Sequence, residues 1–524
     1  MRAGRFTAQQ TRLRFRSSTE PLAASQPRPP SATINAMPRH FFIQTVGCQM
    51  NILDSELLAG ELRRAGHQQV DAIGRADTIL LNTCSVRQHA EDKIYSLLGR
   101  LKELKQQRPE LIIGVLGCMA QKDRHEIFRR APHVALVVGP GQLGQLPALI
   151  ERVAAGGGPQ LEISLDRIGG DRASVERSFV QFAPDRTAVR RPAPHQAMVR
   201  IIFGCDKFCT YCVVPRVRGP EQSRPAAEIV EEVRRLADHG CLEVTLLGQT
   251  VNSYRDTSGP RTVELADLLD MLHEIDGIRR LRFVTNHPRH MTAALVQAMC
   301  VLPKVSPYLH VPAQSGSNAI LERMKRGYTV ESYREMLAFV RHMLPHVAVT
   351  SDFIVGFCGE SEEDFRQTAE LVRDARFKNS FIFKYSGRPG TKADELYVDD
   401  VPEATKRRRN NELLAIQNAI SLEDNQPFLG RTVEILVEGP SKVAKKRGSR
   451  KRASEMMEDP RMGRPYPSPL PNGEGTQLVG RTTCDRIVVF EGSTELIGRI
   501  LPITIEKVDA FTLLGRAVVR DDQQ

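Results

Sequence analysis

Short apolar runs alternate with amphipathic segments through residues 40–155 of the chain. The runs HFFIQTVGC, ADTILLNTC and ELIIGVLGC each precede a segment with helical periodicity, and the first of these segments ends at Ala65–Gly66. Apolar runs of strand length that are each followed by a helix are βα units, and successive βα units form parallel sheets. The pattern therefore predicts an N-terminal α/β domain over residues 38–155.

The same alternation occurs six times between residues 191 and 426. The six apolar runs are AMVRIIFGC, CLEVTLLGQ, LRFVTN, SPYLHVPAQ, VAVTSDFIVGF and NSFIFKYS. Six consecutive βα units predict a partial (β/α)6 barrel, with the chemistry at the carboxyl ends of its strands. The polar stretch 156–190 is expected to link this barrel to the N-terminal domain.

The helical periodicity disappears near residue 427. The runs GRTVEILVEG, RIVVFEG and IGRILPITIEKV are rich in β-branched residues and bounded by glycine, which predicts a small antiparallel β-barrel over residues 427–524. Residues 440–476 interrupt this barrel with a cluster of seven lysines and arginines at 442–452, followed by many prolines. Such a segment cannot bury a core, and we expect a disordered insertion. Its basic cluster either holds RNA phosphates or is a solvated insertion without function.

The composition narrows the class of protein. Of the 524 residues, 41% are hydrophobic and 26% are charged, as in soluble globular proteins. No run approaches the eighteen or so apolar residues of a membrane span, so no membrane partner is expected. A net charge of +11 favours a polyanionic partner such as nucleic acid. Ten cysteines without a secretory signal indicate a cytoplasmic protein whose reduced thiols are available to metals.

The first 36 residues contain six arginines against a single acid, Glu20; the arginines are Arg2, Arg5, Arg12, Arg14, Arg16 and Arg28. This composition resembles an organelle transit peptide. It also fits an unstructured leader, or a start site placed too early with Met37 as the true beginning. We expect residues 1–37 to be a disordered leader and the folded sequence to begin near His40.

Three cysteines follow the first apolar run of the predicted barrel, in GCDKFCTYC: Cys205, Cys209 and Cys212. A structural zinc site takes four Cys or His ligands, and this loop offers no histidine. Each iron of a four-iron cluster takes one outer ligand, usually a Cys thiolate, so three cysteines leave one iron open to a substrate or cofactor. We predict a working cluster with an open position.

Each of the three N-terminal runs also ends at a cysteine: Cys48, Cys84 and Cys118. Open parallel sheets bind ligands at the carboxyl ends of their strands, so these thiols are expected to converge there. A single such cysteine is more often a small buried hydrophobe. Three at the same topological position predict shared metal ligation. The other cysteines lack partners at ligand spacing and are expected to be ordinary buried thiols: Cys241, Cys300, Cys358 and Cys484.

The spacing Cys205-x3-Cys209-x2-Cys212, with Tyr211 before the last cysteine, resembles the signature of radical S-adenosylmethionine (SAM) enzymes. The sequences GCQMN, NTCSVR and GC around the three N-terminal cysteines, ahead of such a core and a small β-barrel, resemble the methylthiotransferases among them. The similarity covers residues 38–520. Further matching runs are LGQ at 247–249, FVTNHP at 283–288, HVPAQSG at 310–316, DFIVGF at 352–357 and RPGT at 388–391.

This resemblance implies SAM and two [4Fe-4S] clusters as cofactors. Cys205, Cys209 and Cys212 would hold the cluster that binds SAM. The trio Cys48, Cys84 and Cys118 would hold an auxiliary cluster that handles the incoming sulfur. By analogy, four further residues are expected to contact SAM: Tyr211, Gln249, Asp352 and Gly356. His287 and His310, near predicted strand ends, are either site residues or packing histidines.

The implied reaction is methylthiolation of C2 of N6-isopentenyladenosine next to the tRNA anticodon. One SAM donates a methyl group, and a second yields a 5′-deoxyadenosyl radical. The C-terminal barrel resembles the TRAM domain, an RNA-binding module, so the tRNA anticodon stem-loop is the expected partner of a monomer, together with sulfur- and electron-donor proteins.

Two other kinds of function stay open. One is a methylthiotransferase for threonylcarbamoyladenosine in tRNA or for a ribosomal-protein aspartate; the other is a non-catalytic iron-sulfur RNA-binding protein. Gln49 and Arg87 favour the isopentenyladenosine enzyme.

Overall fold

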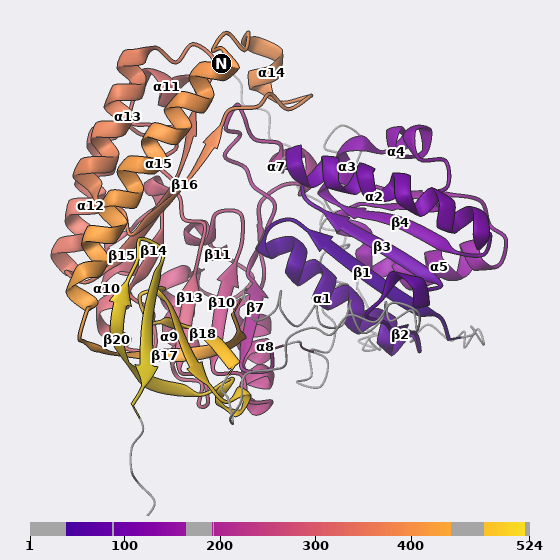
Figure 1. The fold of residues 1–524 in the computed structure, drawn as a ribbon, viewed down its shortest axis with the longest axis horizontal. Helices are drawn as coiled ribbons and strands as arrows, with labels where there is room; N and C mark the ends of the chain where they lie inside the picture. The colour runs from indigo at the N-terminus through magenta and orange to yellow at the C-terminus, as the bar shows by residue number, and fades with distance from the viewer. Residues whose placement is uncertain (1–37, 86–87, 164–190, 192, 442–475, 519–524) are drawn as a thin grey trace, which may run out of the picture. The chain divides into compact units, whose positions relative to one another are not determined.

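The computed structural model describes residues 38–85, 88–163, 191, 193–441 and 476–518 (Figure 1). The predicted leader and nearly all of the predicted basic insertion lie outside these residues. Within them, no helix combines the length and the apolar character that crossing a membrane requires.

The N-terminal domain is built on a parallel sheet, as predicted. Its strand order is β2-β1-β3-β4-β5-β6, and every neighbouring pair is parallel. The strands β5 and β6 have only three residues each, too few for the sequence pattern to identify. Because β6 belongs to the sheet, the sheet continues past residue 155 into the stretch predicted to be a linker. The strands are β1 (His40–Val46), β2 (Gln68–Gln69), β3 (Thr78–Thr83), β4 (Ile112–Gly117), β5 (Leu136–Val138) and β6 (Gln160–Glu162).

Helices cover both faces of this sheet (Figure 1). Successive side chains of a strand point to opposite faces, so Leu80 packs with α1 and α5 while Ile79 and Leu81 pack with α2 and α4. Burial on both faces explains why the strands are almost continuously apolar. The helices are α1 (Gln49–Arg64), α2 (Gln88–Gln107), α3 (Cys118–Asp123), α4 (His125–Arg130) and α5 (Leu146–Ala154).

The central region contains the six predicted strands, arranged as two three-stranded parallel sheets. Their orders are β13-β10-β7 and β14-β15-β16. Backbone hydrogen bonds from Ser306 N to Leu281 O and from Asn286 N to His310 O join the two sheets, giving the predicted partial barrel. The strands are β7 (Gln196–Arg200), β10 (Glu243–Leu247), β13 (Arg280–Phe283), β14 (Tyr308–His310), β15 (Ala348–Val355) and β16 (Asn379–Lys384).

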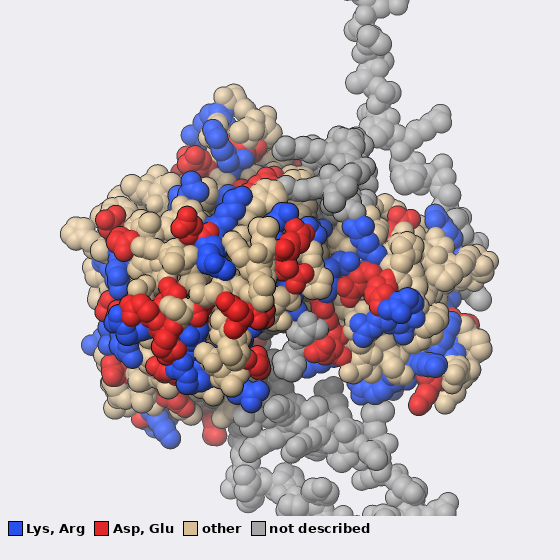
Figure 2. Space-filling view, turned by 90° about the horizontal axis from the view of Figure 1, so that it is seen from above, with Lys and Arg blue, Asp and Glu red and all other residues tan. Residues whose placement is uncertain are grey.

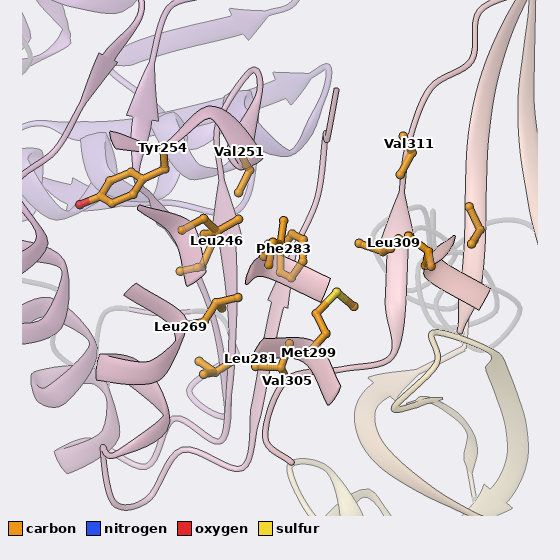
Figure 3. Close-up of a cluster of buried hydrophobic side chains, with 14 of the residues drawn as sticks. Leu246, Val251, Tyr254, Leu269, Leu281, Phe283, Met299, Val305, Leu309 and Val311 are labelled. Atoms are coloured by element: carbon orange, nitrogen blue, oxygen red, sulfur yellow. The ribbon is translucent and has the colours of Figure 1, made fainter. Parts of the chain in front are cut away.

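Helices pack on the outer face of these strands. Figure 3 shows Leu246 of β10 and Phe283 of β13 among side chains from helices α9 and α10, including Leu269 and Met299, and all four are buried. The inner face of the strands is therefore left for the site. The helices of this region are α7 (Val214–Val217), α8 (Ala226–Asp238), α9 (Leu265–His273), α10 (Ala293–Val301), α11 (Asn318–Arg323), α12 (Val330–Met343), α13 (Glu362–Ala375), α14 (Lys392–Leu396) and α15 (Glu403–Asn425), and the short strands are β8 (Ile202–Phe203), β9 (Gln222–Ser223), β11 (Arg255–Asp256) and β12 (Val263–Glu264).

The C-terminal region is a closed five-stranded barrel of order β17-β18-β19-β21-β20. Four of its strand pairs are antiparallel as predicted, but the pair β19–β21 is parallel. Three of its strands follow the predicted runs, and β18 and β21 are additional. The sequence TQLVGRT of β18 follows the proline-rich segment, and TLLGRA of β21 contains a glycine, so neither has a clear strand pattern. The strands are β17 (Thr432–Pro440), β18 (Thr476–Thr482), β19 (Ile487–Gly492), β20 (Ile500–Val508) and β21 (Thr512–Ala517).

Charged and polar contacts attach this C-terminal barrel to the central one. Asp485, between β18 and β19, accepts hydrogen bonds from Arg282 and from Lys378, the latter at 2.8 Å. Burial opposes its ionisation, but Arg282, Lys378 and Arg481 still hold the pKa of Asp485 well below its usual range. Arg280, the first residue of β13, donates to the Arg481 carbonyl at 2.8 Å. Arg280 begins β13 and Lys378 directly precedes β16, so these two contacts lie at the amino ends of core strands, away from the carboxyl ends.

Basic and acidic side chains are interspersed on the face of the molecule shown in Figure 2. The basic excess of the sequence is concentrated elsewhere. Residues 1–36 contain six arginines and one acid, and residues 442–475 contain nine lysines and arginines and four acids. Most of the +11 charge therefore belongs to segments outside the described residues, and any role of that charge in holding RNA depends on them.

Candidate metal centres

Cys48, Cys84 and Cys118, here called the N-terminal triad, follow three adjacent strands. In the sheet, Val46 of β1 lies beside Thr83 of β3, and Thr83 lies beside Gly117 of β4. The chain reaches each cysteine within two residues of these positions. The parallel register therefore brings the three cysteines to one edge of the sheet. Electrostatic interactions link Cys48 with both other thiols, which shows that the three are neighbours.

Glycines and asparagines make this close approach possible. A Cβ atom at Gly47 would lie 2.8 Å from Cys84 Cβ, and one at Gly117, where φ is 85°, would collide with the Asn82 side chain. Asn51 Nδ2 donates to Asn82 Oδ1 at 3.1 Å, and the Cys48 thiol donates to Asn51 Oδ1 at 3.2 Å. Both asparagines are fully buried, so they fix helix α1 against β3 directly beneath the thiols.

An arginine from the central region completes the surroundings of the N-terminal triad. Arg218 Nε donates to Cys118 Sγ at 3.3 Å. Its Nη2 lies 2.8 Å from Asp54 Oδ2 of α1. Hydrogen bonding with Cys84 is the largest cause that lowers the pKa of Cys48 to about 6, and the charge of Arg218 acts in the same direction. One thiol of the triad is therefore ionised at neutral pH, ready to bind metal.

Cys205, Cys209 and Cys212, here called the core triad, lie in the loop between β8 and α7. The loop begins with Gly204, where φ is 59° and an added Cβ would collide with the carbonyl oxygens of Gly219 and Pro220. Cys205 N donates to Gly219 O at 3.2 Å, and Thr210 N donates to Met324 O at 3.1 Å. Backbone contacts thus fix the loop at both ends.

A buried arginine also contacts the core triad. Arg326 Nη1 donates to Cys209 Sγ at 3.3 Å, while its other nitrogens donate to the Tyr328 hydroxyl and the Pro312 carbonyl. Burial raises the pKa of Cys212 to about 12 and also raises the pKa of Cys205. These thiols are protonated at neutral pH and must release protons when they bind a metal.

The donor chemistry of both triads fits a cluster better than a single ion. Among the described residues, no group of three or more His, Cys, Asp or Glu side chains is arranged to hold one metal ion. Each iron of a [4Fe-4S] cluster takes its own outer ligand, so cluster cysteines need not meet at one point. Three thiols with a buried guanidinium beside one of them suit an anionic cluster, which the arginine stabilises.

The four predicted SAM contacts lie on or next to core strands and the core-triad loop. Tyr211 is in that loop and packs against the apolar group around Met324 and Phe357. Gln249 follows β10, and Asp352 is in β15, 3.4 Å from His310 Nε2. Gly356 directly follows β15 with φ of 69°, and its amide donates to Glu360 Oε2 at 2.6 Å. Contact with SAM stays a prediction for all four.

Two exposed aromatic residues were not identified from the sequence. Phe381 and Phe383 of β16 are 48% and 36% exposed, and they alternate with Ser380, which donates to Gln417 of α15. They therefore lie on the inner face, where Phe381 pairs in register with Asp352 and its ring contacts His310. The run NSFIFKYS identified the strand, and its alternation of polar and aromatic residues is the signal that assigns these side chains to the inner face.

The four cysteines outside the triads do not all have the burial that the sequence predicts. Cys241 and Cys358 are buried as expected, but Cys484 is only partly buried and Cys300 is exposed, so the prediction of a buried thiol is wrong for Cys300. Cys300 lies near the end of α10, and its thiol donates to the Met343 carbonyl at 3.4 Å. Burial is the main cause that lowers the pKa of His287 to about 2, so this histidine is neutral at physiological pH, and both interpretations of it stay open.

Comparison with protein-family models supports the three-part organisation. Residues 40–139 match "Uncharacterized protein family UPF0004", residues 199–372 match the radical SAM superfamily, and residues 471–518 match the TRAM domain. These ranges agree with the N-terminal sheet, the central barrel with its core triad, and the C-terminal barrel.

Curated relatives match nearly the whole chain. A tRNA-2-methylthio-N(6)-dimethylallyladenosine synthase from Rhodopirellula baltica is 53% identical over 92% of this chain and 96% of its own length. Proteins of the same name from Delftia acidovorans and Moorella thermoacetica are 42% and 41% identical, over 92% and 91% of this chain and 100% and 98% of their own lengths. Among solved structures, the radical SAM methyltransferase TsrM from Kitasatospora setae aligns with 15% identity and a TM-score of 0.49, covering 68% of this chain and 77% of its own.

Proposed function

The chain belongs to the tRNA-2-methylthio-N(6)-dimethylallyladenosine synthase family of radical SAM methylthiotransferases, and we propose that it attaches a methylthio group to C2 of N6-isopentenyladenosine in tRNA. The observation that carries this proposal is 53% identity to a relative of that name over 92% of the chain. The protein is thus an enzyme, a transferase of tRNA processing. The alternative substrates, threonylcarbamoyladenosine and a ribosomal-protein aspartate, lack comparable support.

The radical SAM family implies a [4Fe-4S] cluster and SAM as cofactors. We assign this cluster to the core triad. When bound, the cluster and SAM supply a carbon radical that can take the hydrogen from C2, an unactivated C–H bond. The chain's own part is to hold the loop rigidly through Gly204 and Thr210 and to keep Arg326 beside Cys209. Cofactors carry the difficult chemistry, and the protein orients and shields it.

We further assign a second [4Fe-4S] cluster to the N-terminal triad. Three neighbouring thiols at the carboxyl edge of the sheet support this assignment, since such edges bind ligands. The ionised Cys48 and the guanidinium of Arg218 supply the donor and the positive charge that an anionic cluster needs. Three ligands leave one iron for sulfur, the element that the reaction must deliver.

We place the target base against the inner face of β16. Proteins recognise unpaired RNA bases by stacking them on aromatic side chains, and enzymes that act on a base first extrude it. Phe381 and Phe383 present aromatic surface there, and the side chains of His310 and Asp352 offer polar groups for the adenine edge. The isopentenyl group of the base is apolar and suits packing against the same two phenylalanine side chains.

The TRAM match supports an RNA-binding role for the C-terminal barrel. We propose the tRNA anticodon stem-loop as the RNA, and proteins that donate sulfur and electrons as further partners. The cytoplasmic location and the monomeric state stay predictions.

Nucleoside mass spectrometry of tRNA from a deletion strain tests the function. We expect the methylthio form of isopentenyladenosine to disappear and the unmethylthiolated form to accumulate. Wild-type protein should restore the product, Cys209→Ala should not, and Cys300→Ala, outside both triads, should restore it. An unchanged level of the methylthio nucleoside in the deletion strain would contradict the proposal, and loss of a methylthio threonylcarbamoyl nucleoside instead would favour the alternative substrate. Release of 5′-deoxyadenosine from SAM in the presence of dithionite distinguishes both methylthiotransferases from a non-catalytic RNA-binding protein, which would release none.

A further inference from the structure

Arg218 belongs to the central region in sequence but contacts the N-terminal domain with its side chain. It follows α7, the short helix after the last cysteine of the core triad. Its Nε donates to Cys118 Sγ at 3.3 Å, and its Nη2 lies 2.8 Å from Asp54 Oδ2. The guanidinium therefore joins a thiol of one triad to a carboxylate of α1, and its own backbone lies six residues after Cys212.

The charges around Arg218 are buried and do not balance. Asp54 also pairs with Arg200 of β7, whose Nη1 lies 2.9 Å from Asp54 Oδ1. The side chains are 4% exposed for Arg218, 5% for Arg200 and 0% for Asp54. Two guanidinium groups thus share one carboxylate, so a further anion is needed to offset the second positive charge. An unbalanced buried charge is costly unless an anion lies beside it.

The orientation of the guanidinium indicates where that anion lies. Arg218 Nη1 is buried and has no hydrogen-bond partner among the residues that the structure describes. The planar fork of arginine can bond a carboxylate with one edge and a second acceptor with the other. Here the Asp54 carboxylate lies beside Nη2, and Nε already bonds the Cys118 sulfur. The described residues thus offer this guanidinium two acceptors, the Asp54 carboxylate and the Cys118 sulfur, and the second belongs to the N-terminal triad.

We propose that Arg218 is a positioning residue for the cluster on the N-terminal triad: it donates a hydrogen bond to the cluster-bound Cys118 thiolate and raises the reduction potential of that cluster. This inference rests on the second cluster assigned above. Hydrogen bonds to the sulfur atoms and the local charge set the potential of such clusters. The N-terminal domain supplies the three ligands, and the central region supplies the residue that tunes them.

The test uses the full chain with Cys205→Ala, Cys209→Ala and Cys212→Ala combined, so that only the N-terminal triad can hold iron. In this background Arg218→Met, Arg218→Lys and Arg200→Met are compared. Arg200 is the matched control: it is equally buried and pairs with the same carboxylate, but it makes no hydrogen bond to a cysteine in the described part of the chain. The readouts are iron content, the electron paramagnetic resonance (EPR) spectrum of the reduced cluster, and its midpoint potential.

We expect about four irons in the background protein. Arg218→Met should shift the midpoint potential to more negative values and change the EPR spectrum, and Arg218→Lys should shift it less because the charge is kept. Arg200→Met should leave both readouts as in the background. If both Arg218 variants lose the iron while Arg200→Met keeps it and all unfold at the same temperature, the positioning role is also supported.

Two results would overturn the inference about Arg218. One is an unchanged potential and spectrum in Arg218→Met with its iron intact; the other is an equal effect of Arg218→Met and Arg200→Met, which would show a role only in holding Asp54. Absence of iron from the background protein itself would instead reject the second cluster, and with it the proposed function of the N-terminal triad.

Discussion

The two triads have the same number of thiols but are assembled in different ways. The core triad comes from one loop of eight residues, Cys205 to Cys212, whose shape is fixed by local backbone contacts. The N-terminal triad comes from three strand ends that are 36 and 34 residues apart in sequence, and only the register of the sheet unites it. The same set of ligands can therefore be encoded by a contiguous motif or by topology alone.

The electrostatic surroundings of the two triads differ as well. Each has an arginine nitrogen 3.3 Å from one cysteine sulfur. Arg218 shares its charge with Asp54, whereas Arg326 bonds the uncharged Tyr328 hydroxyl and Pro312 carbonyl. Cys48 is exposed with a lowered pKa, and Cys212 has a raised one. The N-terminal triad thus has one exposed and ionised thiol, Cys48, beside the buried Cys118, whose pKa burial raises, whereas burial raises the pKa of both Cys205 and Cys212 in the core triad.

Removing one ligand from each triad gives the largest expected effect. Wild-type protein, reconstituted without oxygen, should contain about eight irons, and Cys48→Ala and Cys205→Ala about four each. Cys48→Ala should still cleave SAM but lose methylthiolation, and Cys205→Ala should lose both. Iron analysis together with product assays measures this. Four irons in the wild type, or loss of SAM cleavage in Cys48→Ala, would show that the triads are not two separate centres.

Thiol reactivity in the iron-free protein should separate the triads by their ionisation. A thiolate is the reactive form, so alkylation of Cys48 should rise through pH 6 and level off near neutral pH, because its pKa is lowered to about 6. Alkylation of Cys212 should still be rising at pH 9, because its pKa is raised to about 12. Mass spectrometry of iodoacetamide-labelled peptides measures both, with the exposed Cys300 as an accessible reference. If alkylation of Cys48 and of Cys212 had the same pH dependence, the expected difference in ionisation between these two thiols would be contradicted.

A smaller effect is expected when the packing beneath the N-terminal triad is disturbed. Gly47→Ala places a Cβ 2.8 Å from Cys84 Cβ, and overpacking of this kind costs about 1–3 kcal/mol. Iron content should fall below the wild-type value without falling under four, and SAM cleavage should be kept. Gly74→Ala is the control, because a Cβ there meets no atom within 4 Å. Equal iron content in Gly47→Ala and Gly74→Ala would mean that the close contact between Gly47 and Cys84 does not shape the site.

Much of this arrangement could be predicted from the sequence. The alternation of apolar runs and amphipathic segments identified the parallel sheet and all six core strands. In the N-terminal sheet the signal is strong because its strands are buried on both faces and nearly continuously apolar. Both triads were found because cysteines at strand ends and at fixed spacing are local signals. Strands β2, β5 and β6 were missed because two or three residues carry no period. The longer strands β18 and β21 were missed because each contains a glycine and few apolar residues.

The arginine contacts of the two triads could not be predicted from the sequence. Arg218 and Arg326 lie 100 and 117 residues from the cysteines that they contact, and nothing in the local sequence distinguishes them from other arginines. From the sequence alone, Asp54 resembles an ordinary polar residue of an amphipathic helix. In the structure it is fully buried and pairs with two arginines. Such pairings depend on how distant segments pack, and only the structure shows them.

Helix α7 spans four residues, Val214–Val217, between Cys212 and Arg218. One inserted residue there would rotate everything that follows by about 100° and turn the guanidinium away from Cys118, with all six cysteines still in place. The number of residues in this single turn therefore sets the direction of Arg218 relative to the core triad. A change of length in this turn would separate Arg218 from Cys118 without altering any of the six cysteines.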